Sequence, residues 1–192
     1  MKNKLKSVKI EELERAYEKC LVYFYAFPNR VIGLNELSKS ITSSKTATKQ
    51  AVENLIYQDF IKRDIAGRSW LLSANQKHKY FLTKKVPYHL NKLYESGIVE
   101  FIYNLVPQAR VIILFGSYRW GDDNEDSDID IAVEVLGDRD MEIKNVGIID
   151  QFGYRKKVPV NLHVFSRNKI ELNLFSNIAN GIILDGFLEV RI

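Results

Sequence analysis

The order of apolar and polar residues in the first third of the chain is helical. Between residues 11 and 60 the apolar residues recur at the spacing of one helix face. This pattern predicts three helices, over residues 11–27, 33–41 and 45–60. Pro28 and Asn29 end the first, and the serines of "TSS" (42–44) can cap the third.

Two short strand-like runs, 60–65 and 68–73, follow these helices and are joined by "AGR", which is typical of a hairpin. Helix, short helix, turn, helix and basic hairpin is an element order that resembles winged helix-turn-helix DNA-binding domains. The resemblance implies that the third helix enters the major groove and that the hairpin contacts phosphates. The expected DNA-contacting residues are Lys45, Thr46, Thr48, Lys49 and Gln50 on the helix, and Lys62, Arg63 and Arg68 on the wing. The same pattern also fits a small helical domain used for protein contact or dimerisation.

Residues 76–107 are mainly helical by pattern, with Pro87 and Gly97 as interruptions or boundaries. We interpret this segment as the connection between two domains and the first helix of the second. The expected division is a winged helix-turn-helix domain over 1–75, a helical connection over 76–98 and a second domain over 99–192.

The second domain begins with an apolar run, "VIILF" (111–115), which predicts a strand buried on both faces. Gly116 and Ser117 follow at once, and such a turn can let a phosphate approach the backbone. The next predicted strand, 127–135, would place Asp128 and Asp130 on one face and its isoleucines and valines on the other.

Asp128 and Asp130 would lie roughly 6 to 7 Å apart along that strand. Two carboxylates at this separation repel one another unless a cation lies between them. Mg²⁺ prefers carboxylate and phosphate oxygens and is the expected ion. The acidic stretch therefore predicts a metal site beside a phosphate-holding turn, a combination suited to nucleotide transfer.

The same residues resemble the signature of the minimal nucleotidyltransferases of the DNA polymerase beta superfamily. That signature is a Gly-Ser pair, ten residues and then Asp-x-Asp, and ten residues separate Ser117 from Asp128. The resemblance covers about residues 99–192, including a closing helix, glycine turn and strand in "NLFSNIANGIILDG" (173–186). It implies that Asp128 and Asp130 bind divalent ions. The residues expected to contact the nucleotide are Gly116, Ser117, Arg119 and Ser127.

Two positions depart from the family pattern. The third carboxylate of the family corresponds to Asn161, in the predicted strand 158–166, and an amide cannot act as a base. His163, on the same strand face, could take over the proton transfer or be an ordinary half-exposed histidine. Glu134 and Asp150 are further candidates for the missing acid. In addition, Trp120 stands where many relatives have an arginine before the glycine. Arg119 is displaced from that position by one residue, so the resemblance is weaker support for its phosphate contact than for those of Gly116 and Ser117.

Charge is distributed unevenly along the chain, although its formal net charge is only +4. Residues 1–75 carry 13 Lys and Arg against 8 Asp and Glu, whereas residues 110–192 carry 10 against 14. A basic amino-terminal part favours a polyanionic partner, and an acidic carboxy-terminal part favours bound cations. Cys20 is the only cysteine, which excludes an intramolecular disulfide and favours the cytoplasm. The apolar run 20–27 is too short to span a bilayer, so we expect no membrane partner.

The chain is therefore expected to be an α+β protein, with an N-terminal winged helix-turn-helix and a C-terminal nucleotidyltransferase α/β domain that has a mixed sheet. The leading hypothesis is an Mg²⁺-dependent enzyme that moves a nucleoside monophosphate from ATP or another nucleoside triphosphate to a hydroxyl of an unidentified acceptor. The resemblance suggests a partner toxin protein as one such acceptor. The alternative is a DNA-binding transcriptional regulator whose second domain senses nucleotide or is catalytically impaired. The third hypothesis is a scaffold whose two domains only mediate oligomerisation, and a homodimer is one expected assembly.

Overall fold

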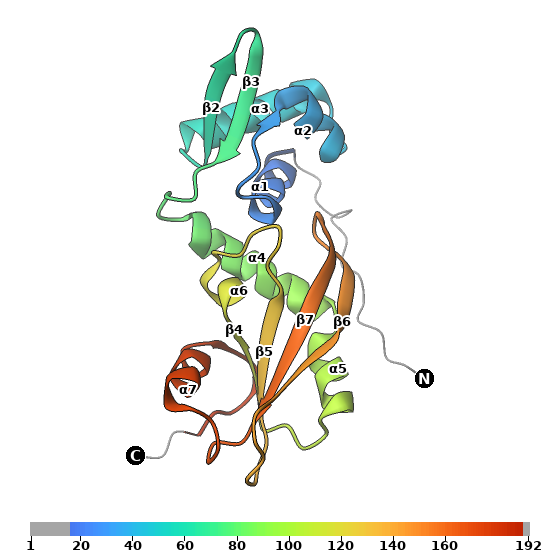
Figure 1. Cartoon of the computed structure of the whole chain (residues 1–192). Coiled ribbons are helices and arrows are strands. Elements are labelled where there is room, and N and C mark those ends of the chain that lie inside the picture. Colours follow the sequence, from blue (N-terminus) through green and yellow to red (C-terminus); the bar gives the residue numbers. More distant parts are fainter. Residues whose placement is uncertain (1–15, 190–192) are drawn as a thin grey trace.

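A computed structural model describes residues 16–189 of the chain. The first five residues of the predicted first helix, 11–15, lie outside this range. Within it the chain is α+β, as predicted. Figure 1 shows the amino-terminal elements at one end of the molecule, helix α4 across the middle and a five-stranded sheet at the other end.

The amino-terminal elements form a winged helix-turn-helix, because three helices pack with a three-stranded antiparallel sheet of order β1-β3-β2. Helix α3 begins where the sequence predicts, since the Ser44 side chain accepts a hydrogen bond of 3.2 Å from the Ala47 amide. It ends three residues earlier than predicted. The elements are α1 (Ala16–Ala26), β1 (Ile32–Gly33), α2 (Leu34–Ser40), α3 (Lys45–Tyr57), β2 (Ile61–Ala66) and β3 (Ser69–Ala74).

Two helices connect this part to the sheet. Helix α4 (Phe81–Glu95) lies within the segment predicted to be mainly helical, 76–107, and Pro87 lies inside it rather than at its boundary. Gly97 has φ of 73° and separates α4 from α5 (Ile98–Leu105). A left-handed residue at this point turns the chain, so α5 packs beside the sheet instead of continuing α4 (Figure 1).

The carboxy-terminal sheet is mixed and has the order β6-β7-β5-β4-β8. Strands β5 and β7 are parallel, and the other neighbours are antiparallel. A short helix, α6 (Ser117–Trp120), follows β4, and α7 (Leu172–Ala179) precedes β8. The strands are β4 (Val111–Phe115), β5 (Ile129–Glu134), β6 (Glu142–Phe152), β7 (Arg155–Phe165) and β8 (Ile182–Gly186).

The two faces of the sheet are buried by different helices. Ile129, Ile131 and Val133 of β5 join the core that includes Leu93 of α4 and Ile102 of α5. The opposite face packs on α7 through a second, smaller cluster, which is formed by Val111, Ile113, Phe115, Ala132, Phe165 and Ile178. The predicted alternation along β5 is therefore confirmed, and the aspartate face is the α7 face.

Helix α7 covers only part of its face. At the end of the sheet where β4 finishes and β5 starts, Asp128, Asp130, Asn161 and His163 are half-buried rather than covered. Within residues 16–189, no helix combines the length and the apolar composition needed to cross a bilayer.

Candidate active site

Gly116 brings the chain's backbone against one of the two predicted metal ligands. It directly follows β4, whose last residue, Phe115, pairs with Asp130 of β5. Its φ of 69° and ψ of −156° lie in a region that only glycine adopts without strain. A Cβ at this position would lie 2.9 Å from Asp130 Oδ2. The turn and the aspartate are thus packed together, so Gly116 cannot be replaced without displacing one of them.

The residues after Gly116 form a tight turn of helix. Ser117 opens α6, and Gly121 closes it with φ of 78°. A Cβ at Gly121 would lie 3.0 Å from Val86 Cγ2 of α4, so α4 packs closely on this turn. Arg119 Nε donates to the Asn180 carbonyl at 2.7 Å, and its guanidinium lies 3.7 Å from the centre of the Trp120 ring. Arg119 is therefore engaged with the turn between α7 and β8 and with Trp120.

Strand β7 supplies a polar partner to each aspartate. Asn161 pairs in register with Asp130, as expected for the position of the third family carboxylate. Its Nδ2 donates a short hydrogen bond to Asp128 Oδ2, and its Oδ1 accepts from Asn145 Nδ2 at 3.3 Å. His163 Nε2 lies 3.1 Å from Asp130 Oδ1. The structure thus brings together all four predicted catalytic residues.

The contacts of His163 favour a structural role over that of a base. A hydrogen bond to a carboxylate requires the proton on Nε2, the nitrogen that faces the site. The other nitrogen, Nδ1, is buried and has no hydrogen-bond partner among the described residues. The ring also packs edge-on against Phe115, with centroids 4.8 Å apart. His163 therefore orients Asp130: its Nε2 directs a proton, not a lone pair, at the carboxylate, and the lone pair is on the buried Nδ1.

The donor set at this point fits a hard divalent cation. Asp128 and Asp130 offer carboxylate oxygens, and both remain partly accessible beside the backbone of Gly116. Mg²⁺ is typically held by one or two carboxylates together with substrate phosphates and water. No three His, Cys, Asp or Glu side chains within residues 16–189 form a complete metal cluster, which agrees with asparagine at position 161.

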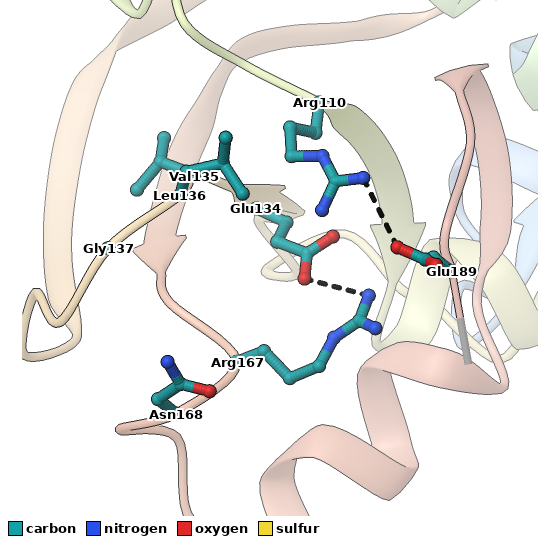
Figure 2. A pocket seen from close by; sticks show the side chains of 8 residues that line it. All are labelled: Arg110, Glu134, Val135, Leu136, Gly137, Arg167, Asn168 and Glu189. Atoms are coloured by element: carbon teal, nitrogen blue, oxygen red, sulfur yellow. Dashed lines mark hydrogen bonds and ion pairs between the residues drawn. The ribbon is translucent and has the colours of Figure 1, made fainter. Parts of the chain in front are cut away.

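Neither of the other acids proposed for the third position lies in this site. Glu134 is four residues beyond Asp130 on β5, which corresponds to about 13 Å along the strand. It is buried in a pocket at the opposite end of the sheet, where Glu134 Oε1 pairs with Arg167 Nη2 at 2.8 Å (Figure 2). Asp150 lies on β6, opposite the start of β7 and about four residues from the level of Asn161. The hypotheses for Glu134 and Asp150 are therefore wrong.

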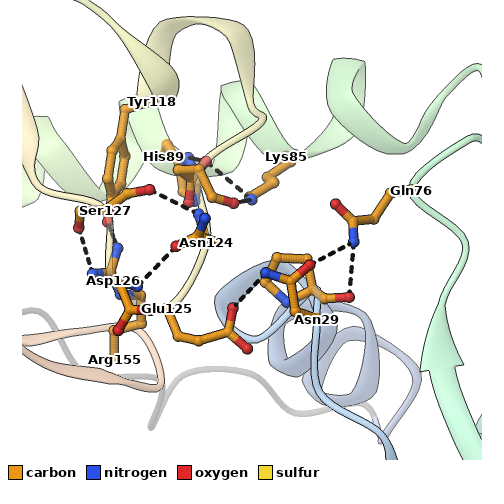
Figure 3. A network of polar contacts seen from close by, with 12 residues as sticks. Asn29, Gln76, Lys85, His89, Tyr118, Asn124, Glu125, Asp126, Ser127 and Arg155 are labelled. Atoms are coloured by element: carbon orange, nitrogen blue, oxygen red, sulfur yellow. Dashed lines mark hydrogen bonds and ion pairs between the residues drawn. The ribbon is translucent and has the colours of Figure 1, made fainter.

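The acidic loop before Asp128 is held by a buried polar network that the sequence did not reveal (Figure 3). Lys85 Nζ of α4 pairs with Asp123 Oδ1 at 3.0 Å, and both side chains are almost completely buried. Burial raises the pKa of Asp123 to about 6 and lowers the pKa of Lys85. Burial also lowers the pKa of the neighbouring His89 well below its ordinary value, so His89 is neutral.

Arg155 and Ser127 complete this network. Arg155, the first residue of β7, donates short hydrogen bonds to the Ser127 carbonyl and to the Tyr118 hydroxyl. The Ser127 hydroxyl accepts from the Asn124 amide at 3.0 Å, so its first role is to close the loop. On the side of the winged domain, Asn29 Nδ2 donates to Glu125 Oε2 at 3.3 Å. The loop thus contacts α4, β7 and the turn after α1.

The predicted DNA-contacting residues lie on one helix and one hairpin, with one exception. All of them except Thr48 are exposed, from Lys45 of α3 to Arg68 of the wing. Thr48 is fully buried, and its hydroxyl donates to the Ser44 carbonyl at 2.9 Å, so its predicted base contact is wrong. Trp70, which the sequence did not single out, lies 5.6 Å from Lys49 Nζ and 4.7 Å from Arg63 Cζ. It gathers cations of the helix and the wing on one surface.

The comparisons with known proteins agree with the geometry of the carboxy-terminal part. Residues 95–184 match the family model of the nucleotidyltransferase domain. The matched segment contains the Gly116 turn, both aspartates and Asn161, and the match supports nucleotidyl transfer in general terms. No curated protein matches the chain.

Among solved structures, the chain is similar to a crystal structure of the adhesin competence repressor (AdcR) from Streptococcus pyogenes. The identity is 15%, the match covers 50% of this chain and 70% of that one, and the TM-score is 0.35. A TM-score this low does not define a common fold.

Proposed function

We propose that the protein is an Mg²⁺-dependent nucleotidyltransferase that moves a nucleoside monophosphate from ATP or another nucleoside triphosphate to a hydroxyl of an acceptor molecule. The observation that carries this proposal is the contact between the Gly116 turn and the Asp130 carboxylate, inside a segment that matches the nucleotidyltransferase domain. A turn that admits phosphates and a carboxylate pair that admits a cation lie side by side. This juxtaposition is what a metal-bound triphosphate requires.

In the proposed reaction the acceptor oxygen bonds to the α-phosphorus, the bond from that phosphorus to the β-bridging oxygen breaks, and pyrophosphate leaves. Mg²⁺ on Asp128 and Asp130 would neutralise the charge that develops on the phosphate oxygens. Gly116 and Ser117 would hold the phosphates, while His163 and Asn161 orient the two aspartates. Because Asn161 cannot accept a proton, the hydroxyl proton passes to solvent, and we expect slow transfer.

The test is transfer of label from each α-labelled nucleoside triphosphate to macromolecules of a cell lysate in the presence of Mg²⁺. We expect Asp128→Ala/Asp130→Ala to lower the rate by about a thousandfold, since the cation would lose its ligands. The matched control, Asp126→Ala/Asp140→Ala, removes two exposed acids and should label as the wild type does. Equal labelling by wild type and the Asp128/Asp130 variant would contradict the proposal, as would no labelling at all.

A second function, binding of duplex DNA, is favoured by the surface around Trp70. Five cations of α3 and the wing are exposed, namely Lys45, Lys49, Lys62, Arg63 and Arg68, and two of them, Lys49 and Arg63, lie over this ring. Helix α3 also exposes Thr46 and Gln50, which are short enough to contact base edges. A DNA-binding protein that senses nucleotide through its second domain is the alternative to the enzyme.

DNA binding is tested by fluorescence anisotropy with a library of labelled duplexes at several salt concentrations. Lys45→Ala/Lys49→Ala is expected to weaken binding and to reduce the slope of log affinity against log salt by about 2, one for each lost phosphate contact. Lys77→Ala/Lys79→Ala removes two exposed lysines from the segment between β3 and α4 and should leave the slope unchanged. If both variants reduce the slope alike, the helix is not the contact surface.

A further inference from the structure

Arg155 connects two segments that the proposed function needs to keep in register. Its Nη1 donates to the hydroxyl of Tyr118, the residue directly after Ser117. Its Nη2 donates to the carbonyl of Ser127, the residue directly before Asp128. One guanidinium therefore joins the turn proposed to hold phosphates to the strand proposed to hold the metal.

The environment of Arg155 makes this connection rigid. Arg155 is buried, and Tyr118 is fully buried with its ring packed against His89 and Phe152. Burial raises the pKa of Tyr118, so its hydroxyl remains protonated and accepts the hydrogen bond. The Ser127 carbonyl belongs to a loop whose hydroxyl–amide bond to Asn124 is 3.0 Å long. Both acceptors are thus fixed before any ligand binds.

The chemistry of the side chain suits a bridge between two acceptors. A guanidinium is planar and donates from two nitrogens in fixed directions, whereas an ammonium is a single donor centre on a flexible stem. Arg155 also begins the strand that carries Asn161, which donates to Asp128. Strand β7 therefore holds Asp128 in two ways. Asn161 bonds to the Asp128 side chain, and Arg155 bonds to the carbonyl of Ser127, the residue before Asp128.

We propose that Arg155 is a positioning residue that sets the spacing between the Gly116-Ser117 turn and the Asp128-Asp130 pair, so that both engage one metal-bound nucleotide. This inference rests on the proposed nucleotidyltransferase function. Arg155 does not touch the nucleotide in this arrangement; it acts through Tyr118 and Ser127. Replacing it should therefore change the metal-dependent part of nucleotide affinity.

The experiment measures, by isothermal titration calorimetry, binding of the four α,β-methylene nucleoside triphosphates, which cannot be cleaved at the reacting bond. Each titration is done with Mg²⁺ and with EDTA, at a temperature where thermal melts show each variant to be folded. Arg155→Lys keeps the positive charge but replaces the two donor nitrogens by a single donor centre. We expect it to weaken Mg²⁺-dependent binding about tenfold, the usual size of such indirect effects on metal sites. Binding in EDTA should change much less.

Tyr118→Phe provides a second, milder variant that keeps the buried ring and removes one acceptor. It should weaken Mg²⁺-dependent binding about threefold to tenfold, the range for one hydrogen bond. If the wild type binds and both variants bind as tightly, with only their melting temperatures lowered, Arg155 is merely structural and the inference is overturned. If the wild type shows no Mg²⁺-dependent binding to any of the four analogues, the proposed function itself is contradicted and the inference falls with it.

Discussion

Replacement of Lys85 by methionine is expected to lower the free energy of unfolding by about 3–5 kcal/mol near neutral pH, the usual cost of removing one partner of a buried ion pair. Lys85 Nζ contacts both Oδ1 and the carbonyl oxygen of Asp123, at 3.0 and 2.5 Å. Lys85 is the ion-pair partner of this buried carboxylate, and neighbouring His89 is neutral. The variant would leave the buried Asp123 carboxylate without its ion-pair partner. Urea unfolding followed by circular dichroism measures the loss.

The pH dependence of this loss separates charge from packing. The folded pKa of Asp123, about 6, is raised above its ordinary value of 3.8, so this group favours the folded state below 3.8 and loses that contribution as pH rises through about 6. Without Lys85 the folded pKa rises further. The deficit of Lys85→Met should therefore shrink when the pH is lowered from about 7.5 to about 5, because Asp123 is then protonated in both proteins.

The charge-free double variant is the control for the same experiment. Lys85→Met/Asp123→Asn removes both charges, and replacing both members of a buried pair is often close to neutral. We expect its free energy of unfolding to lie nearer to the wild type than to the single variant. A double variant as unstable as Lys85→Met, with a deficit independent of pH, would show that the pair matters through its packing alone.

The parts of the fold that the sequence predicted well are those whose pattern is dictated by local chemistry. Strand β4 has the predicted bounds because five apolar residues in a row, ended by Gly116, are consistent with a strand buried on both faces. The aspartate face of β5 follows from strict alternation. The site could therefore be located from sequence, including the position of Asn161 beside Asp130.

Strand β6 was not predicted, although it has 11 residues. It lies at the edge of the sheet and is mostly exposed, with Ile143 and Ile148 open to solvent, so its residues show no alternation of buried and exposed positions. Its irregular pairing near Gly147 disturbs the pattern further. The strand depends on its long antiparallel pairing with β7, a tertiary contact that no local pattern encodes.

The buried polar network around Asp123 and Arg155 could not be predicted from the sequence for a similar reason. Lys85 is one of several lysines in a helical pattern, and a lysine is almost never fully buried unless it is paired. Only the approach of the acidic loop to α4 makes this lysine an interior residue. Arg155 likewise stands next to Lys156 and Lys157 as one of three cations, and the fold buries it alone. The prediction for Thr48 failed in the opposite direction. This polar residue was expected to contact DNA, but it is buried and bonds to the backbone at the start of its own helix.

Replacement of Asn161 by aspartate is expected to give the largest increase in transfer rate. Its amide donates to Asp128, so it neutralises part of the repulsion between the two aspartates without any cation. Asn161→Asp replaces this donor by a third carboxylate facing the same oxygen. If the amide is what keeps transfer slow, the change supplies both a metal ligand and a base, and the transfer rate should rise by about a hundredfold or more.

The same substitution should make folding depend on the cation. Three carboxylates around one point repel each other, so Asn161→Asp should melt at a lower temperature than the wild type in EDTA and recover in Mg²⁺, since a ligand bound only by the folded state stabilises it. Asn161→Ala is the matched control, because it also loses the hydrogen bond to Asp128 but adds no charge. It should melt early in both buffers. Equal Mg²⁺ responses of the Asp and Ala variants would mean that position 161 does not face the cation, and the amide would then act only as a tether between β7 and Asp128.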